Sequence, residues 1–249
     1  ETPDEYRCFV LEWPFTTTKY VTGHRVRPGN TTVVHHALGF LIGPENVPAV
    51  RAFEAADPAP GYRCFGGPTA EGAEQLPLNF LASWAPGGEG GLDRPAGTGI
   101  QARPGSLFVM QIHYNTDHPV DPTPDLTAID FSLEDEVATR AFSIAWFDVR
   151  WFFEPELMDI PAGKASVVHT YEALPSQSAG VIALSDGETY PRGMWLHSAM
   201  PHMHTFGQSI TIAVVHPDGT RDTLMTIPKW DFHWQREYVW QEPASLDPG

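Results

Sequence analysis

Short apolar or alternating runs, most of them closed by Gly, Pro or Asp, recur along the chain. Apolar side chains at every second position, or in one short unbroken run, are typical of β-strands. The clearest of these predicted strands lie at residues 31–42, 106–115, 126–133, 139–149, 178–185, 209–217 and 222–230. Between the last two, the sequence HPDGT at 216–220 has the residues of a hairpin turn.

Helical patterns are scarce. The best candidate is residues 44–57, where Val50 and Phe53 share one face of a short amphipathic helix. With 24 Pro and 22 Gly distributed along the chain, many short strands and long loops favour a β-sandwich over a wound α/β sheet. We expect an all-β fold with a domain break near residues 140–150, dividing the chain into 1–144 and 145–249.

Charge limits the classes of partner. The 249 residues contain 15 Lys+Arg and 31 Asp+Glu, giving a net charge of -16, and no cluster of basic residues interrupts this acidity. Such a chain repels phosphate backbones and anionic lipid, so we expect no nucleic-acid partner. No apolar segment approaches the roughly 20 residues needed to cross a bilayer, and no signal-peptide pattern opens the chain, so we expect no membrane insertion.

The two cysteines, Cys8 and Cys64, lie in the same Tyr-Arg-Cys-Phe frame. Two free thiols in the core are one interpretation. We favour a disulfide, because the repeated frame suggests that the two segments lie side by side. Closing so long a loop would stabilise the fold by roughly 4 kcal/mol and would indicate an oxidising compartment outside the cytoplasm, secreted or periplasmic.

Two groups of histidines carry the candidate chemistry. His35 and His36 are adjacent in an apolar run, so in a regular strand they would face opposite sides, and a bulge or twist is needed to bring both to one ion. His113 would come from a second strand, and three neutral imidazoles suit copper or zinc. His202 and His204 lie two apart in MPHMHTFG, so an extended backbone would direct both imidazoles to one side.

The remaining histidines carry less information. Five lie singly near turns or in mixed surroundings, where surface or hydrogen-bonded structural roles are expected: His24, His118, His169, His197 and His216. His233 is expected to pack among Trp230, Phe232 and Trp234. No recognisable carboxylate pair, GxSxG, HExxH or phosphate-binding glycine loop is present, which argues against glycosidase, serine hydrolase and metalloprotease chemistry.

Several motifs together resemble one family. In order along residues 4 to 241 they are YRCF, VRPGNTTVVHHALGF, GYRCFGG, WAPG, PGS, MQIHYN, IPAG, HMH followed by FG, and WDFHWQ. The chain thereby resembles the copper type II, ascorbate-dependent monooxygenases, which include the peptidylglycine α-hydroxylating and dopamine β-hydroxylating enzymes and bacterial relatives.

The resemblance implies two antiparallel β-sandwich domains that face each other across a cleft, with one copper ion on each. His35, His36 and His113 match the ligands of the electron-transfer copper. His202 and His204 match two ligands of the copper at which dioxygen and substrate react, and are the catalytic candidates. Ascorbate would be the reductant, dioxygen the co-substrate, and a small organic molecule with an activated carbon-hydrogen bond the substrate. Cys8 and Cys64 match a family disulfide.

The chain departs from the family in two places. The family's second copper takes a Met ligand from a strand beyond WDFHWQ, and this chain ends at Gly249, so we expect either a truncated copy or an incomplete second site. Met203 would face away from the histidines beside it, which leaves Met194, Met200 and Met225 as candidates. Met200 also replaces the arginine with which peptide-amidating members bind a peptide carboxylate, which argues against a glycine-extended peptide as substrate.

Two alternatives to a copper monooxygenase remain open. One is a non-catalytic copper-binding β-sandwich that retains the histidines but lacks a complete second site. The other is a zinc hydrolase that uses only His35, His36 and His113 and keeps an open fourth position on the metal.

Overall fold

The structure is a computed structural model. It describes residues 4–86, 88, 90–117, 121–152, 154–175, 178, 193–232 and 234–246. The fold is all-β with several antiparallel sheets, as predicted. Among the described residues, no helix is long and apolar enough to cross a membrane.

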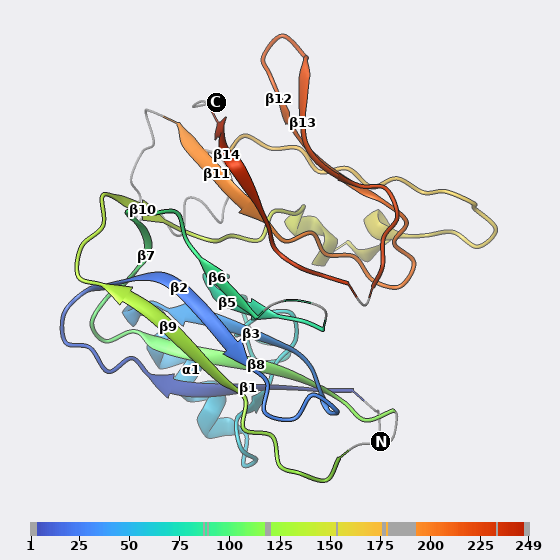
Figure 1. The fold of residues 1–249 in the computed structure, drawn as a ribbon. Helices are drawn as coiled ribbons and strands as arrows, with labels where there is room; N and C mark the ends of the chain where they lie inside the picture. The colour runs from blue at the N-terminus through green and yellow to red at the C-terminus, as the bar shows by residue number, and fades with distance from the viewer. Residues whose placement is uncertain are drawn as a thin grey trace.

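The first half of the chain forms two packed sheets (Figure 1). The first has the order β4-β1-β8-β3-β5, with strands β1 (Asp4–Glu12), β3 (Val34–Ile42), β4 (Tyr62–Arg63), β5 (Phe80–Trp84) and β8 (Leu107–Asn115). The second has the order β10-β7-β2-β6, and β9 also pairs with β2. Its strands are β2 (Lys19–Arg27), β6 (Gly91–Asp93), β7 (Thr98–Ala102), β9 (Ala128–Glu134) and β10 (Thr139–Ala141). The short β10 pairs parallel to β7, whereas the other pairs are antiparallel.

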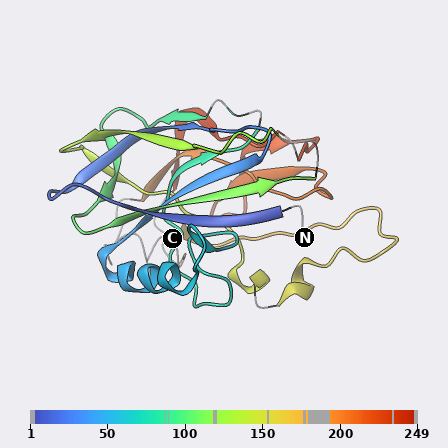
Figure 2. The same ribbon diagram turned by 90° about the horizontal axis from the view of Figure 1, so that it is seen from below.

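The first sheet is buried on both faces, which explains the nearly unbroken apolar sequence of its central strands. Phe40 of β3 packs with Val109 and with Val50 of the helix, while its neighbour Leu41 packs with Ile100 of the second sheet. The helix, α1 (Val47–Ala56), follows a 3-10 turn at Pro44–Asn46, so the predicted helix at 44–57 is confirmed. Figure 2 shows α1 on the side of the first sheet away from β2 and β9.

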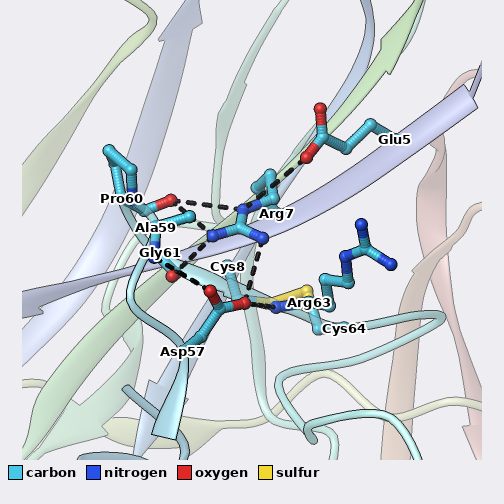
Figure 3. Close-up of polar contacts among 9 residues, drawn as sticks. All are labelled: Glu5, Arg7, Cys8, Asp57, Ala59, Pro60, Gly61, Arg63 and Cys64. Carbon is cyan, nitrogen blue, oxygen red and sulfur yellow. Dashed lines mark hydrogen bonds and ion pairs between the residues drawn. A yellow bond between two sulfur atoms is a disulfide. The ribbon is translucent and has the colours of Figure 1, made fainter. Parts of the chain in front are cut away.

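The predicted disulfide joins Cys8 and Cys64. The two frames lie side by side as expected, because β1 pairs with β4. Arg7 beside this bond is buried, and its guanidinium donates to Pro60 O, Gly61 O and the Asp57 carboxylate (Figure 3). A buried guanidinium requires such partners. Through these bonds, Arg7 in β1 holds the loop that precedes Cys64 against the first strand.

The second half is built differently. Two 3-10 turns, at Val149–Phe152 and Pro155–Met158, precede strands β11 (Met194–Ala199), β12 (Ile210–Val215), β13 (Arg221–Ile227) and β14 (Tyr238–Leu246). Within the described part of this half, the strands form two separate two-stranded sheets, β11-β14 and β12-β13. The hairpin turn predicted at 216–220 joins β12 to β13, and Figure 1 shows this hairpin projecting from the rest of the molecule.

One predicted strand is largely wrong. Residues 139–149 are a mostly apolar run, but only Thr139–Ala141 pairs with a neighbour, and the following residues are irregular. The Asp148 carboxylate accepts a bond from the backbone N–H of Arg150, which favours the turn that follows. An apolar run does not form a strand where no partner strand is available. The strand predicted at 178–185 lies, apart from Ser178, outside the described residues.

Candidate metal centre

Three histidines from two neighbouring strands meet at one end of the first sheet. β3 and β8 are antiparallel, and His36 lies opposite His113. The register shifts between Val34 and His36, which is the irregularity needed to direct His35 and His36 toward the same space. One ring nitrogen from each of His35, His36 and His113 lies within 4.8 Å of the others. The bulge and the predicted grouping are both confirmed.

The rings are arranged edge to face around a common point. The His113 ring centroid lies 4.8 Å from that of His36 and 4.8 Å from that of His35. The Nδ1 atoms of His113 and His36 are 3.3 Å apart. Two such nitrogens share a proton in the apo protein or direct their lone pairs at one ion, and three of them are a suitable donor set for copper or zinc.

Burial disfavours the protonated form of two of these histidines. It lowers the pKa of His36 to about 3, and the nearby imidazoles of His113, His35 and His202 add to this shift. Burial also lowers the pKa of His113, although Asp4 opposes the shift. Neutral imidazoles keep the lone pairs that a metal ion requires, so near neutral pH His36 and His113 are in the ligating form.

A carboxylate lies directly behind this group, and the sequence interpretation missed it. Asp4 Oδ1 is 2.8 Å from His113 Nε2 and also accepts a 2.8 Å bond from the Asn115 side chain. The Tyr6 ring stacks on His113, with centroids 4.0 Å apart and 8° between the ring planes. The available signal was the spacing of Asp4 and Tyr6, which lie two apart just before Cys8, but only the structure pairs their strand with the His113 strand.

The second histidine group lies on a loop. β11 ends at Ala199, and residues 201–204 have no regular secondary structure. The rings of His202 and His204 still lie together, with centroids 5.1 Å apart. His202 Nδ1 is 2.6 Å from Gln235 Oε1, which anchors this ring. A backbone bond from Gly207 N to His204 O closes the following turn, where a Cβ on Gly207 would clash with Met203 and Trp230.

The two histidine groups lie near one another, where the two halves of the chain are in contact. His202 is near enough to lower the pKa of His36 further. The ring of Phe232, from the second half, stacks against His35 at 5.9 Å between centroids. The Ser83 hydroxyl in β5 is 3.4 Å from Met200 Sδ. The tertiary structure therefore brings together side chains that the sequence separates by more than 160 positions, as with His36 and His202.

The chain matches no protein-family model, and a search of curated proteins found no match. The resemblance to copper monooxygenases therefore rests on the motifs and remains a proposal.

The candidate third ligands of the second group lie in different places. The Met200 sulfur already contacts Ser83, and Met225 lies in the projecting hairpin opposite Ile212. Met194 begins β11, opposite Leu246. The structure therefore does not single out one thioether for His202 and His204.

The other histidines include one buried member. His24 in β2 is buried, and this burial, with the nearby Arg94 charge, lowers its pKa to about 4. His169 is exposed, and His216 pairs with Asp222 at 2.8 Å on the β12-β13 hairpin. His118 and His233 lie outside the described residues.

Proposed function

We propose that this protein is a copper-dependent monooxygenase that hydroxylates an activated carbon-hydrogen bond of a small organic substrate. Dioxygen would be the co-substrate and ascorbate the electron donor. The observation that carries the proposal is that the His35, His36 and His113 group lies near the His202 and His204 pair, with contacts between the two halves beside both groups. The order of motifs along the chain supports it.

The residues present fit copper. All five candidate ligands are imidazoles, which copper accepts in both of its common oxidation states. Bound copper would supply one-electron transfer and the binding of dioxygen. In this assignment His35, His36 and His113 hold the ion that passes on the electron, while His202 and His204 hold the ion at which dioxygen and substrate react.

The protein side chains orient the proposed ligands. The Gln235 amide oxygen engages Nδ1 of His202, so the other ring nitrogen, Nε2, is the one left for an ion. The disulfide agrees with an extracytoplasmic location, secreted or periplasmic, because disulfides persist in oxidising compartments. The assignment of Nε2 of His202 as a ligand atom and the extracytoplasmic location are both parts of the proposed function.

A non-catalytic copper-binding protein is the second candidate. It is favoured by the loop position of the His202 and His204 pair and by the contact that already engages the Met200 sulfur. An ion held by two imidazoles and water would be bound more weakly than one held by three imidazoles.

Metal content and oxygen consumption test the proposal together. The purified protein would be loaded anaerobically with Cu(I), desalted and analysed for metal, and ascorbate-dependent oxygen uptake would then be measured across a panel of small organic substrates. We expect close to two equivalents of copper, one of them lost in His36→Ala and the other in His202→Ala. His169→Ala, at an exposed position, is the matched control and should retain both.

The alternatives give different results. Two bound coppers without substrate-dependent oxygen uptake would favour the non-catalytic protein. A single equivalent of metal, with zinc preferred to copper, would favour a zinc hydrolase. An anomalous diffraction map with only one metal position would contradict the two-copper assignment.

A further inference from the structure

The histidine of the HYN motif is contacted from the first strand by two side chains. In the antiparallel pair β1 and β8, Asp4 lies opposite Asn115 and Tyr6 lies opposite His113. Residues two apart on a strand share a face, so these four side chains project from the same side of the sheet. Asp4 reaches His113 diagonally, at 2.8 Å from Nε2.

These contacts restrict the proton on His113 to one nitrogen. An ionised carboxylate only accepts hydrogen bonds, so Nε2 must carry the proton that it donates to Asp4 Oδ1. Asn115 donates to the same oxygen and holds the carboxylate in place. The Nδ1 atom of His113 is then left with its lone pair directed at the group, where it lies 3.3 Å from His36 Nδ1.

The ring plane of His113 is restrained as well. Tyr6 stacks on one face of the imidazole, and Phe65 packs edge-on against Tyr6 at 5.0 Å between centroids. Stacking limits rotation of the imidazole ring, while the Asp4 bond selects its tautomer. The sheet therefore presents Nδ1 of His113 in one orientation before any ion binds.

We propose that Asp4 is a positioning residue of the three-histidine site. It holds His113 in the Nε2-protonated tautomer, so that the site takes copper through Nδ1 of His113. A histidine ligand that donates its other N–H to a carboxylate is better oriented and more basic, and loss of such a partner lowers metal affinity by about 10- to 100-fold. This inference rests on the proposed metal site.

The effect of Asp4 on His113 can be distinguished from a general role of Asp4 in the stability of the sheet. Asp4 is the first residue of β1, and its side chain is 46% exposed. The pairs from Glu5 to Glu12 keep β1 in register with β8. Replacing Asp4 should therefore leave the sheet intact.

The chain also offers a matched control. His216 Nε2 is 2.8 Å from Asp222 Oδ2, the same type of contact at the same length, on the projecting hairpin. Asp222→Asn changes such a bond away from both histidine groups.

Two measurements on the full chain test the inference. First, the metal-free protein, labelled with 15N at histidine, reports the tautomer of His113 by imidazole NMR. Second, anaerobic competition between the protein and a chelator for Cu(I) gives the affinity of the tighter site. Wild type and the variants Asp4→Asn, Asp4→Ala and Asp222→Asn are compared, with thermal unfolding to verify that each is folded.

We expect the Nε2-protonated tautomer in wild type and a mixture of tautomers in Asp4→Ala, with a 10- to 100-fold loss of Cu(I) affinity. Asp4→Asn keeps an acceptor oxygen and should lose less, and Asp222→Asn should match wild type. A His113 tautomer unchanged in Asp4→Ala would overturn the inference, as would an unchanged affinity. Failure of wild type to bind Cu(I) would instead overturn the proposed metal site, a result distinct from tight binding in all four proteins.

Discussion

The two halves of the molecule hold their histidines in different ways. In the first half, two sheets and α1 pack around three buried apolar clusters, a disulfide joins β1 to the residue after β4, and the three-histidine group lies on adjacent strands. In the described part of the second half, two small sheets leave large side chains in solvent: Trp195 is 62% exposed and Phe206 81%. His202 and His204 lie on a loop between those sheets.

The two groups of histidines are therefore held with different rigidity, although their side chains are the same. Strands packed on both faces hold a side chain closely, whereas loops beside sparse packing open locally at low free-energy cost. We therefore expect the first histidine group to be preformed and the second to depend on contacts across the two halves. The following experiments test this comparison, beginning with the largest expected effect.

Removing apolar volume should destabilise the first half far more than the second. Phe40 is fully buried and packs on Phe80, so Phe40→Ala should lower the free energy of unfolding by about 3 to 5 kcal/mol. Val239 in β14 is largely exposed, so Val239→Ala should cost less than about 1 kcal/mol. Urea unfolding measures both, and equal losses would contradict the comparison.

Reducing the Cys8–Cys64 disulfide should act mainly on the first half. The bond closes a loop with a sequence separation of 56, and loop-closure entropy gives a stabilisation of about 4 kcal/mol. Mass spectrometry of unreduced peptides should detect the linked pair. Urea unfolding with and without reductant measures the loss, and native protein with two free thiols would refute the bond.

Acid should destabilise the protein partly through His24. Its folded pKa is about 4, below its usual value near 6.5, because burial and the nearby Arg94 charge disfavour the protonated form. The unfolded chain therefore binds the proton more readily, and a contribution of up to about 3 kcal/mol, present above pH 6.5, is lost as the pH falls toward 4. His24→Gln should reduce the stability difference between pH 7 and pH 4.5, whereas His169→Gln should not.

Copper should leave the second histidine group first. With three imidazoles against two, we expect at least a tenfold difference in affinity, equivalent to about 1.4 kcal/mol. Stepwise chelation, followed by the copper remaining in wild type, His36→Ala and His202→Ala, measures the order of release. If both ions resist equally, a further group must complete the His202 and His204 site, with Met194 or Met200 the first candidates to substitute.

Much of the fold could be predicted because local patterns determined it. The β3 and β8 segments are apolar enough to be buried on both faces, and the helix at 44–57 shows its apolar face through Val50 and Phe53. The bulge at His35 and His36 also followed from the sequence, since adjacent residues in a regular strand face opposite sides. The strand prediction for residues 139–149 was largely wrong because a strand needs a partner strand, and pairing with a partner is not a local property of the sequence.

The sequence by itself determined the types of side chain at the candidate site and the all-β character, and it favoured the pairing of the two cysteines. Only the tertiary structure decided what surrounds the histidines. Asp4 contacts His113 across 109 positions, and the ring of Phe232, from the other half of the chain, stacks against His35. Short-range periodicity reports which face of a strand a residue occupies, but contacts between distant segments depend on strand order, register and packing, which arise only when the chain has folded.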